Sequence, residues 1–177
     1  LQDGHADLVC LRYLQDKVPP LFHRDIQPNN IVWDNRQRYV LIDFNISTSV
    51  DDKAFAGTLP YMAPDLILSN KTIDWGPSAD TFSLGITLYQ LVAHAYPWPG
   101  SSMHPKLYEA PTDIRKYNDK ISDAFADFIM KSIITDKTKR FGTAKEMSDA
   151  LEAIGPDGIE KKSDTTQTTV LTDDIVA

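Results

Sequence analysis

Cysteine is almost absent from this chain of 177 residues, and Cys10 is the one thiol. A single cysteine cannot form a disulfide within the chain, so the disulfide-stapled domains of secreted proteins are excluded. Cys10 lies in the apolar pattern of Leu8, Leu11 and Leu14, and we expect a small buried thiol on a helix rather than a nucleophile. This cysteine usage fits a reducing compartment, and we expect a cytoplasmic protein.

The chain also lacks an excess of basic residues and any long apolar run. Its net charge of −7 argues against nucleic acid or an anionic membrane as the main partner. The most apolar stretch, Phe82 to Ala95, is too short to span a bilayer and contains Gln90, so we expect no membrane segment. Leu1 to His5 has neither a basic region nor an apolar core, so we expect no signal peptide.

Helical patterns dominate the rest of the sequence. Residues 80–94 are apolar on most faces, which predicts a buried central helix. The other helices are bounded by residues with known capping and stopping preferences. We expect them over residues 8–15 before Pro19–Pro20, after an N-cap at Ser122, and after a capping box of Thr143 and Glu146 that ends at Gly155–Pro156.

Two short apolar runs, residues 30–33 and 39–42, flank a polar segment with turn chemistry, which predicts one small β-hairpin. Residues 45–59 have no period and are expected to be a loop. The fold predicted from these patterns is mainly α. Residues 157–177 are rich in Thr, Asp and Lys and have no aromatics, and we expect a disordered tail there.

The most informative segment is His23-Arg24-Asp25-Ile26-Gln27-Pro28-Asn29-Asn30, which resembles the protein-kinase catalytic loop H-R-D-L-x-x-x-N. Transfer to a substrate hydroxyl needs a carboxylate that orients the hydroxyl and takes its proton, and Asp25 is placed for that role. The hairpin ends at Asp43-Phe44-Asn45, which resembles D-F-G. The resemblance implies that Asn30 and Asp43 hold magnesium on the phosphates of ATP.

A third segment, Gly57 followed by Thr58-Leu59-Pro60-Tyr61-Met62-Ala63-Pro64-Asp65, resembles the G-T-x-x-Y-x-A-P-E end of the kinase activation loop. The resemblance implies that Thr58 hydrogen-bonds near the catalytic Asp. It also implies a protein substrate, because related kinases of small molecules such as aminoglycosides usually lack this segment.

Two later matches imply structural support. Asp80-Thr81-Phe82-Ser83-Leu84-Gly85 resembles D-x-W-S-L-G, whose Asp accepts hydrogen bonds from the catalytic-loop backbone. The resemblance implies that Asp80 braces Asp25, and that His23 and Arg24 also support the site. The stretch from Asp136 to Phe141 resembles the D-x-x-x-R-x motif, and this implies a buried ion pair between Arg140 and Asp65.

Together, the motifs resemble the C-terminal lobe of a eukaryotic-type Ser/Thr protein kinase over residues 8–154. The implied fold is a helical bundle around a buried central helix, with one hairpin that carries the catalytic and metal loops. The implied reaction is ATP- and Mg²⁺-dependent phosphotransfer to Ser or Thr of a protein. No G-x-G-x-x-G occurs, so we expect residues 1–156 to be the C-lobe alone, with an N-lobe supplied by the same parent chain.

Several positions depart from the family pattern. Gln27 stands where Ser/Thr kinases usually have a Lys that contacts the transferred phosphate, and we expect Gln27 to lie by the γ-phosphate as a catalytic residue that slows transfer without changing its type. Asn45 replaces the Gly of D-F-G, and Asp65 replaces a Glu that is one methylene longer, so we expect a longer ion pair with Arg140. Ala54 occupies the usual phosphoacceptor position of the activation loop, with Ser47, Thr48 and Ser49 as alternatives. Asp51 and Asp52 could supply fixed negative charge to Arg24 instead, which predicts a loop that needs no phosphorylation. An alternative reading of the departures is a pseudokinase that binds or scaffolds.

A last departure concerns the region after Tyr96-Pro97-Trp98-Pro99, where the family normally has a helix that docks protein partners. Pro105 and Pro111 interrupt this region, and proline disfavours a helix interior. We therefore expect a short or irregular version of that helix.

Overall fold

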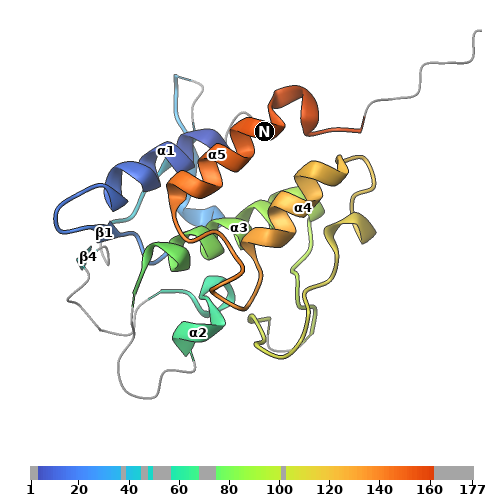
Figure 1. The fold of residues 1–177 in the computed structure, drawn as a ribbon, viewed down its shortest axis with the longest axis horizontal. Coiled ribbons are helices and arrows are strands. Elements are labelled where there is room, and N and C mark those ends of the chain that lie inside the picture. The colour runs from blue at the N-terminus through green and yellow to red at the C-terminus, as the bar shows by residue number, and fades with distance from the viewer. Residues whose placement is uncertain are drawn as a thin grey trace, which may run out of the picture.

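Five α-helices and two pairs of short strands form the described part of the chain (Figure 1). The computed structural model describes residues 4–36, 39–44, 48–49, 57–67, 75–100 and 103–161. Helix α3 lies at the centre, with α4 packed along it and with α1 packed against α5. This arrangement confirms the predicted mainly α fold around a central helix. The helices are α1 (Gly4–Gln15), α2 (Pro64–Ile67), α3 (Pro77–Ala93), α4 (Asp123–Ser132) and α5 (Ala144–Ile154).

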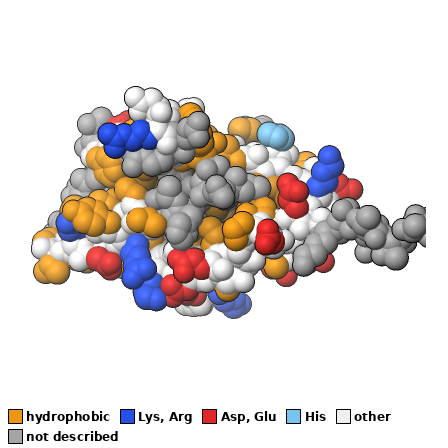
Figure 2. All heavy atoms as spheres, turned by 90° about the horizontal axis from the view of Figure 1, so that it is seen from above, with side chains coloured by type: hydrophobic (Ala, Val, Ile, Leu, Met, Phe, Trp, Pro, Cys, Tyr) orange, Lys and Arg blue, Asp and Glu red, His pale blue; other side chains and the backbone are white. Residues whose placement is uncertain are grey.

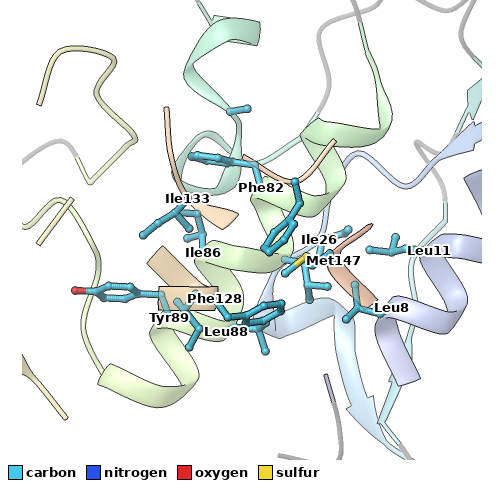
Figure 3. Close-up of a cluster of buried hydrophobic side chains, with 14 of the residues drawn as sticks. Leu8, Leu11, Ile26, Phe82, Ile86, Leu88, Tyr89, Phe128, Ile133 and Met147 are labelled. Carbon is cyan, nitrogen blue, oxygen red and sulfur yellow. The ribbon is translucent and has the colours of Figure 1, made fainter. Parts of the chain in front are cut away.

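Helix α3 is buried along nearly its whole length because its sequence is apolar on most faces. It begins at Pro77, earlier than predicted, since proline's fixed φ suits the first helical turn. It ends at Ala93, and its C-cap His94 has a left-handed φ of 51° and donates its backbone N–H to Gln90 O at 2.9 Å. Figure 3 shows the core, in which side chains of α3 meet others from α1, the loop of residues 23–30, α4 with its C-cap, and α5: Leu8, Leu11, Ile26, Phe82, Ile86, Leu88, Tyr89, Phe128, Ile133 and Met147.

The predicted N-caps are present at both C-terminal helices. Ser122 accepts a hydrogen bond from the backbone of Phe125, and Thr143 accepts one from the backbone of Glu146. The capping box at α5 differs in its second half, because the Glu146 carboxylate accepts from the backbone N–H of Gly142 rather than from that of Thr143. The N-terminal N–H groups of α5 are satisfied further by Gln15 of α1, whose Oε1 accepts from Ala144 N at 2.8 Å.

The predicted hairpin is formed by β2 (Ile31–Trp33) and β3 (Tyr39–Leu41), which pair antiparallel with Ile31 opposite Leu41. A second antiparallel pair joins β1 (Leu21–Phe22) to β4 (Thr48–Ser49). The prediction of one small hairpin is therefore confirmed, because β1 and β4 lie far apart in the sequence, whereas the prediction of a loop over residues 45–59 was wrong at β4. A strand of two residues is too short to show a period in the sequence.

The prediction of a disordered tail over residues 157–177 was wrong for its first residues, 157–161, which are described and packed on the core. Residues 156–158 form a short 3₁₀-helix, and Ile159 is buried. Glu160 then makes a β-bridge with Ile121, and Ser122 N donates to Ile159 O at 2.8 Å. Because this stretch is mostly polar, its composition did not indicate that the Ile159 side chain packs on the core. Residues 162–177 lie outside the described residues.

The segment between α3 and α4 is irregular, as the prolines predict. Among residues 103–121, the one helical element that the structure describes is the 3₁₀-helix Ile114–Lys116. The segment is nevertheless anchored to the core, because Trp98 Nε1 donates to Glu109 O at 2.7 Å and the Tyr89 hydroxyl donates to Thr112 O at 2.8 Å. Within the described part of the chain, no helix is both long and apolar enough to cross a membrane.

The packing of α3 on α4 yields a testable prediction at Gly85. A Cβ at this position would lie 2.7 Å from the Cβ of Ser132 and 2.9 Å from Ile133 Cγ2. We expect Gly85→Ala to lower the free energy of unfolding by about 1–3 kcal/mol, because the two helices must separate. Urea denaturation followed by tryptophan fluorescence measures this change.

The matched control is Gly142→Ala, whose Cβ would meet only Glu146 Oε2 at an ordinary 3.5 Å. We expect a change of about 0.5 kcal/mol or less for the control. Equal stability of the two variants would contradict the close approach of α3 to α4.

Candidate functional site

The catalytic loop is held by one buried carboxylate from α3. The Oδ2 atom of Asp80 accepts from His23 N at 2.8 Å, and Oδ1 accepts from Arg24 N at 2.9 Å. Burial raises the pKa of Asp80 to about 6, against the opposing effect of these two hydrogen bonds and of the Arg24 charge. The carboxylate thus takes up two backbone donors in a loop where no helix or sheet can satisfy them.

The backbone turns sharply at Arg24, which has a left-handed φ of 73°. Its side chain is buried, and its guanidinium lies 4.6 Å from the ring centre of Trp75. Trp75 has no counterpart in the motifs used for the sequence predictions. The turn directs the next residue, Asp25, into a half-exposed position where several polar groups meet.

His23 is fully buried and links the catalytic loop to the end of the hairpin. Its Nδ1 atom accepts from Asp25 N at 3.3 Å, and its Nε2 atom lies 3.1 Å from Ile42 O. This pair of contacts requires the neutral ring with its proton on Nε2. The ring also meets Phe44 edge-on, with the ring centres 4.7 Å apart.

Side-chain donors from three positions converge on the carboxylate of Asp25. The hydroxyl of Thr58 donates to Oδ1 at 2.7 Å, while Gln27 Nε2 and Asn30 Nδ2 each donate to Oδ2 at 3.0 Å. Asn30 is buried and also donates from Nδ2 to the backbone oxygen of Asp25 at 2.8 Å. Its two amide protons are therefore both committed to Asp25, which leaves its amide oxygen as the group available to a metal.

The hairpin brings the backbone of Asn30 to that of Ile42, the residue before Asp43. The backbone N–H of Ile42 donates to Asn30 O at 2.8 Å, directly beside Asp43. Asp43 has a left-handed φ of 65° and an exposed side chain. An amide oxygen and a carboxylate are hard oxygen ligands, so this donor pair fits Mg²⁺. Asn45, at the glycine position of D-F-G, lies outside the described residues.

The segment from Gly57 to Tyr61 is fixed to the rest of the site from two sides. Gly57 has a φ of 110°, and a Cβ there would lie 2.6 Å from Arg24 O, so this close approach requires glycine. On the other side, the Tyr96 hydroxyl donates to Pro60 O at 2.5 Å, and the Ser83 hydroxyl donates to Tyr61 O at 2.8 Å. The motif comparison identified neither Tyr96 nor Ser83 as an anchor, since nothing in the sequence pattern shows which hydroxyl meets this segment.

An ion pair joins Asp65 in α2 to Arg140, which lies between α4 and α5. Arg140 Nη2 lies 2.9 Å from Asp65 Oδ1, with the Arg140 side chain fully buried and the Asp65 side chain 25% exposed. Arg140 Nε also donates to Ser78 O at 3.1 Å. Burial lowers the pKa of Arg140, and the charge of Asp65 opposes that shift. The pair is less buried than expected on the Asp65 side, and at 2.9 Å it is not lengthened by the shorter Asp side chain.

The residues invoked for the control of the activation loop cannot be placed in the structure. Asp51, Asp52 and Ala54 lie outside the described residues, and the hypothesis of a loop that needs no phosphorylation stays a prediction.

His23 yields a prediction about pH. Burial lowers its pKa below the ordinary value of 6.5, against the opposing effects of the Ile42 hydrogen bond and the charges of Asp25 and Asp43. Because the unfolded chain binds this proton at pH values where the folded chain does not, His23 lowers the free energy of unfolding as the pH falls below 6.5. Asp80 has the opposite sign, since its raised pKa gives a stabilisation that is lost as the pH rises through about 6.

An NMR titration of the His23 ring resonances separates the two groups. The expected midpoint lies below 6.5, and a midpoint above 6.5 would mean that the protonated ring is favoured, which the contact with Asp25 N excludes.

Comparison with known proteins agrees with this geometry. Residues 8–151 match the protein kinase domain family. The chain is 38% identical over 103 residues to the dual specificity mitogen-activated protein kinase kinase jkk-1 of Caenorhabditis elegans, covering 56% of this chain and 23% of that protein. It is 30% identical over 161 residues to rhodopsin kinase GRK1 of Homo sapiens, covering 84% of this chain and 27% of that protein.

A solved structure shares the fold. The Cydia pomonella granulovirus kinase PK-1 superposes with a TM-score of 0.68 at 21% identity, covering 81% of this chain and 54% of that one. The chain spans about a quarter of the length of the two curated relatives. The family match extends over most of the chain and includes the loop in which donors converge on Asp25. The chain therefore belongs to the protein kinase domain family.

Proposed function

We propose that this chain is the C-terminal lobe of a Ser/Thr protein kinase that transfers the γ-phosphate of ATP to a protein hydroxyl. The observation that carries the proposal is the arrangement around Asp25. Its carboxylate is oriented by Thr58, Gln27 and Asn30, yet it remains half-exposed, as a group that must meet a substrate hydroxyl requires.

In this proposal Asp25 orients the substrate hydroxyl and accepts its proton as the new P–O bond forms. Thr58 holds one carboxylate oxygen by its hydroxyl and begins the segment over which the substrate peptide lies. His23 and Asp80 do not touch the substrate. They fix the backbone on either side of Asp25, so that its carboxylate needs no reorganisation during the reaction.

Asn30 and Asp43 are the residues that would hold Mg²⁺. When bound, the ion neutralises the charge on the transferred phosphate. The hairpin contact between Ile42 N and Asn30 O supports this assignment, since it keeps the two ligands together irrespective of the ion. The commitment of both Asn30 amide protons to Asp25 supports it as well, because it determines which end of the amide points away from that residue.

An N-lobe from the same parent chain is the partner that the proposal requires. Ile42 and Phe44 flank Asp43 and are 38% and 43% exposed. Apolar side chains are also exposed among charged ones over the face of the molecule seen in Figure 2. Ile42 and Phe44 belong to the loop that would meet ATP, so the second lobe would cover them and complete the nucleotide site.

The direct test is Asp25→Asn in the complete natural polypeptide that contains this sequence, assayed with ATP, Mg²⁺ and peptides that bear Ser or Thr. We expect phosphotransfer to fall by about 10²–10⁴-fold, because the amide cannot take the proton. We expect little change in thermal stability, because the amide oxygen still accepts a hydrogen bond.

The matched control is Asp34→Asn, the same chemical change at the hairpin turn, where Asp34 Oδ1 accepts from Arg36 N at 2.8 Å. Its turnover should equal that of the wild type. Retained turnover in Asp25→Asn would remove Asp25 from the reaction. A wild-type protein that binds a partner but transfers no phosphate would favour the pseudokinase alternative.

A further inference from the structure

Gln27 lies between two groups that can only accept hydrogen bonds from it. Its Nε2 atom is 3.0 Å from Asp25 Oδ2 and 3.0 Å from Thr58 Oγ1. The carboxylate of Asp25 has no proton to give. The hydroxyl of Thr58 has one proton, which it donates to Asp25 Oδ1 at 2.7 Å. Both neighbours therefore require an N–H, and this determines which way the Gln27 amide points.

These three side chains form a closed ring, in which Gln27 donates to Asp25 and to Thr58, and Thr58 donates to Asp25. A glutamine amide has two N–H donors, and the ring uses both. Gln27 has no donor left for a phosphate oxygen, and its remaining polar atom is an acceptor that a phosphate would repel. A lysine has three N–H donors and a charge, so it could make both ring bonds and still contact a phosphate.

The ring also joins two segments that are far apart in the sequence. Thr58 begins the segment that Tyr96 and Ser83 hold at Pro60 and Tyr61. The Thr58 carbonyl accepts from Tyr61 N at 2.9 Å, so the position of Thr58 and the turn that follows it depend on each other. Gln27 is the one side chain of the ring that contacts both the catalytic carboxylate and this segment without belonging to either.

We propose that Gln27 is a positioning residue that holds Asp25 and Thr58 in register, and that it does not bind the transferred phosphate as the family comparison suggested. This inference rests on the proposed kinase function. It implies that the ring, in which the uncharged Gln27 replaces a lysine, couples the position of the segment that begins at Thr58 to the orientation of the Asp25 carboxylate. Loss of the ring should therefore reduce kcat and weaken peptide binding, while the KM for ATP stays unchanged.

The test uses the complete natural polypeptide with two variants that remove one ring member each at nearly constant volume. These are Gln27→Met, which has no donor, and Thr58→Val, which has no hydroxyl. We expect each variant to lower kcat/KM for the peptide by about tenfold or more. We expect the peptide kcat/KM of the double variant to be no lower than that of the less active single variant, because the ring is already broken in each single variant. The KM for ATP should stay within about twofold of wild type.

Two conservative variants guard against a general structural effect. Thr58→Ser keeps the hydroxyl and Gln27→Lys keeps the donors, so each should recover most of the peptide kcat/KM that Thr58→Val and Gln27→Met lose. An increase in the KM for ATP in Gln27→Met, with effects additive to those of Thr58→Val, would overturn the proposal and assign Gln27 to the phosphate.

Hydrogen exchange at the Tyr61 amide tests the ring separately from catalysis. It should accelerate in Gln27→Met and Thr58→Val and remain slow in Thr58→Ser. If the wild-type protein transfers no phosphate, the proposed function fails, but this readout still decides on the ring. Unchanged exchange at Tyr61 in Gln27→Met would overturn the coupling.

Discussion

The carboxylate of Asp80 is the interaction on which the rest of the site depends. It lies in the first turn of α3, buried, and it accepts the two backbone N–H groups that precede Asp25. A buried carboxylate is costly, as its raised pKa shows. The cost is offset because the alternative would leave two backbone donors unsatisfied in a loop with irregular geometry. Because the acceptor lies on a buried helix, these two hydrogen bonds tie the loop directly to the core.

From this anchor the site extends in two directions. Towards the hairpin, the His23 ring contacts Ile42 O, and Ile42 N donates to Asn30 O. The positions of the proposed metal ligands, Asn30 and Asp43, therefore depend on the position of His23. Towards the substrate segment, Gly57 approaches Arg24 O, and the ring of Gln27 and Thr58 closes on Asp25. Each link is short and polar. Removing one of these contacts should therefore shift the Asp25 carboxylate, even where the altered residue does not contact Asp25.

The sequence predicts those features of the fold that depend on local chemistry. The apolar run of α3, the caps at Ser122 and Thr143, and the hairpin are all visible as periodicities or capping patterns, and the structure has them. The predictions fail where a contact depends on the tertiary arrangement. β4 has only two residues, and the burial of Ile159 depends on a neighbour that the local pattern does not reveal.

The same distinction applies to the site. The motifs indicate which residue types gather, because phosphotransfer requires a base and hard oxygen ligands. They do not indicate how hydrogen bonds are distributed among them. Gln27 looks like a weakened phosphate contact in the sequence, whereas in the structure both of its donors go to Asp25 and Thr58. Which groups compete for a donor is decided only once the loops are placed.

The role of Asp80 as the anchor of the loop is tested most directly by hydrogen exchange at the backbone amides of His23 and Arg24, in the complete protein and in its Asp80→Asn variant. The amide of asparagine offers one oxygen where the carboxylate offers two. At least one of these amides should exchange faster in the variant, while the amides in the interior of α3 stay protected. Wild-type exchange rates at both amides would contradict the role of Asp80 as the anchor, and so would loss of protection throughout α3.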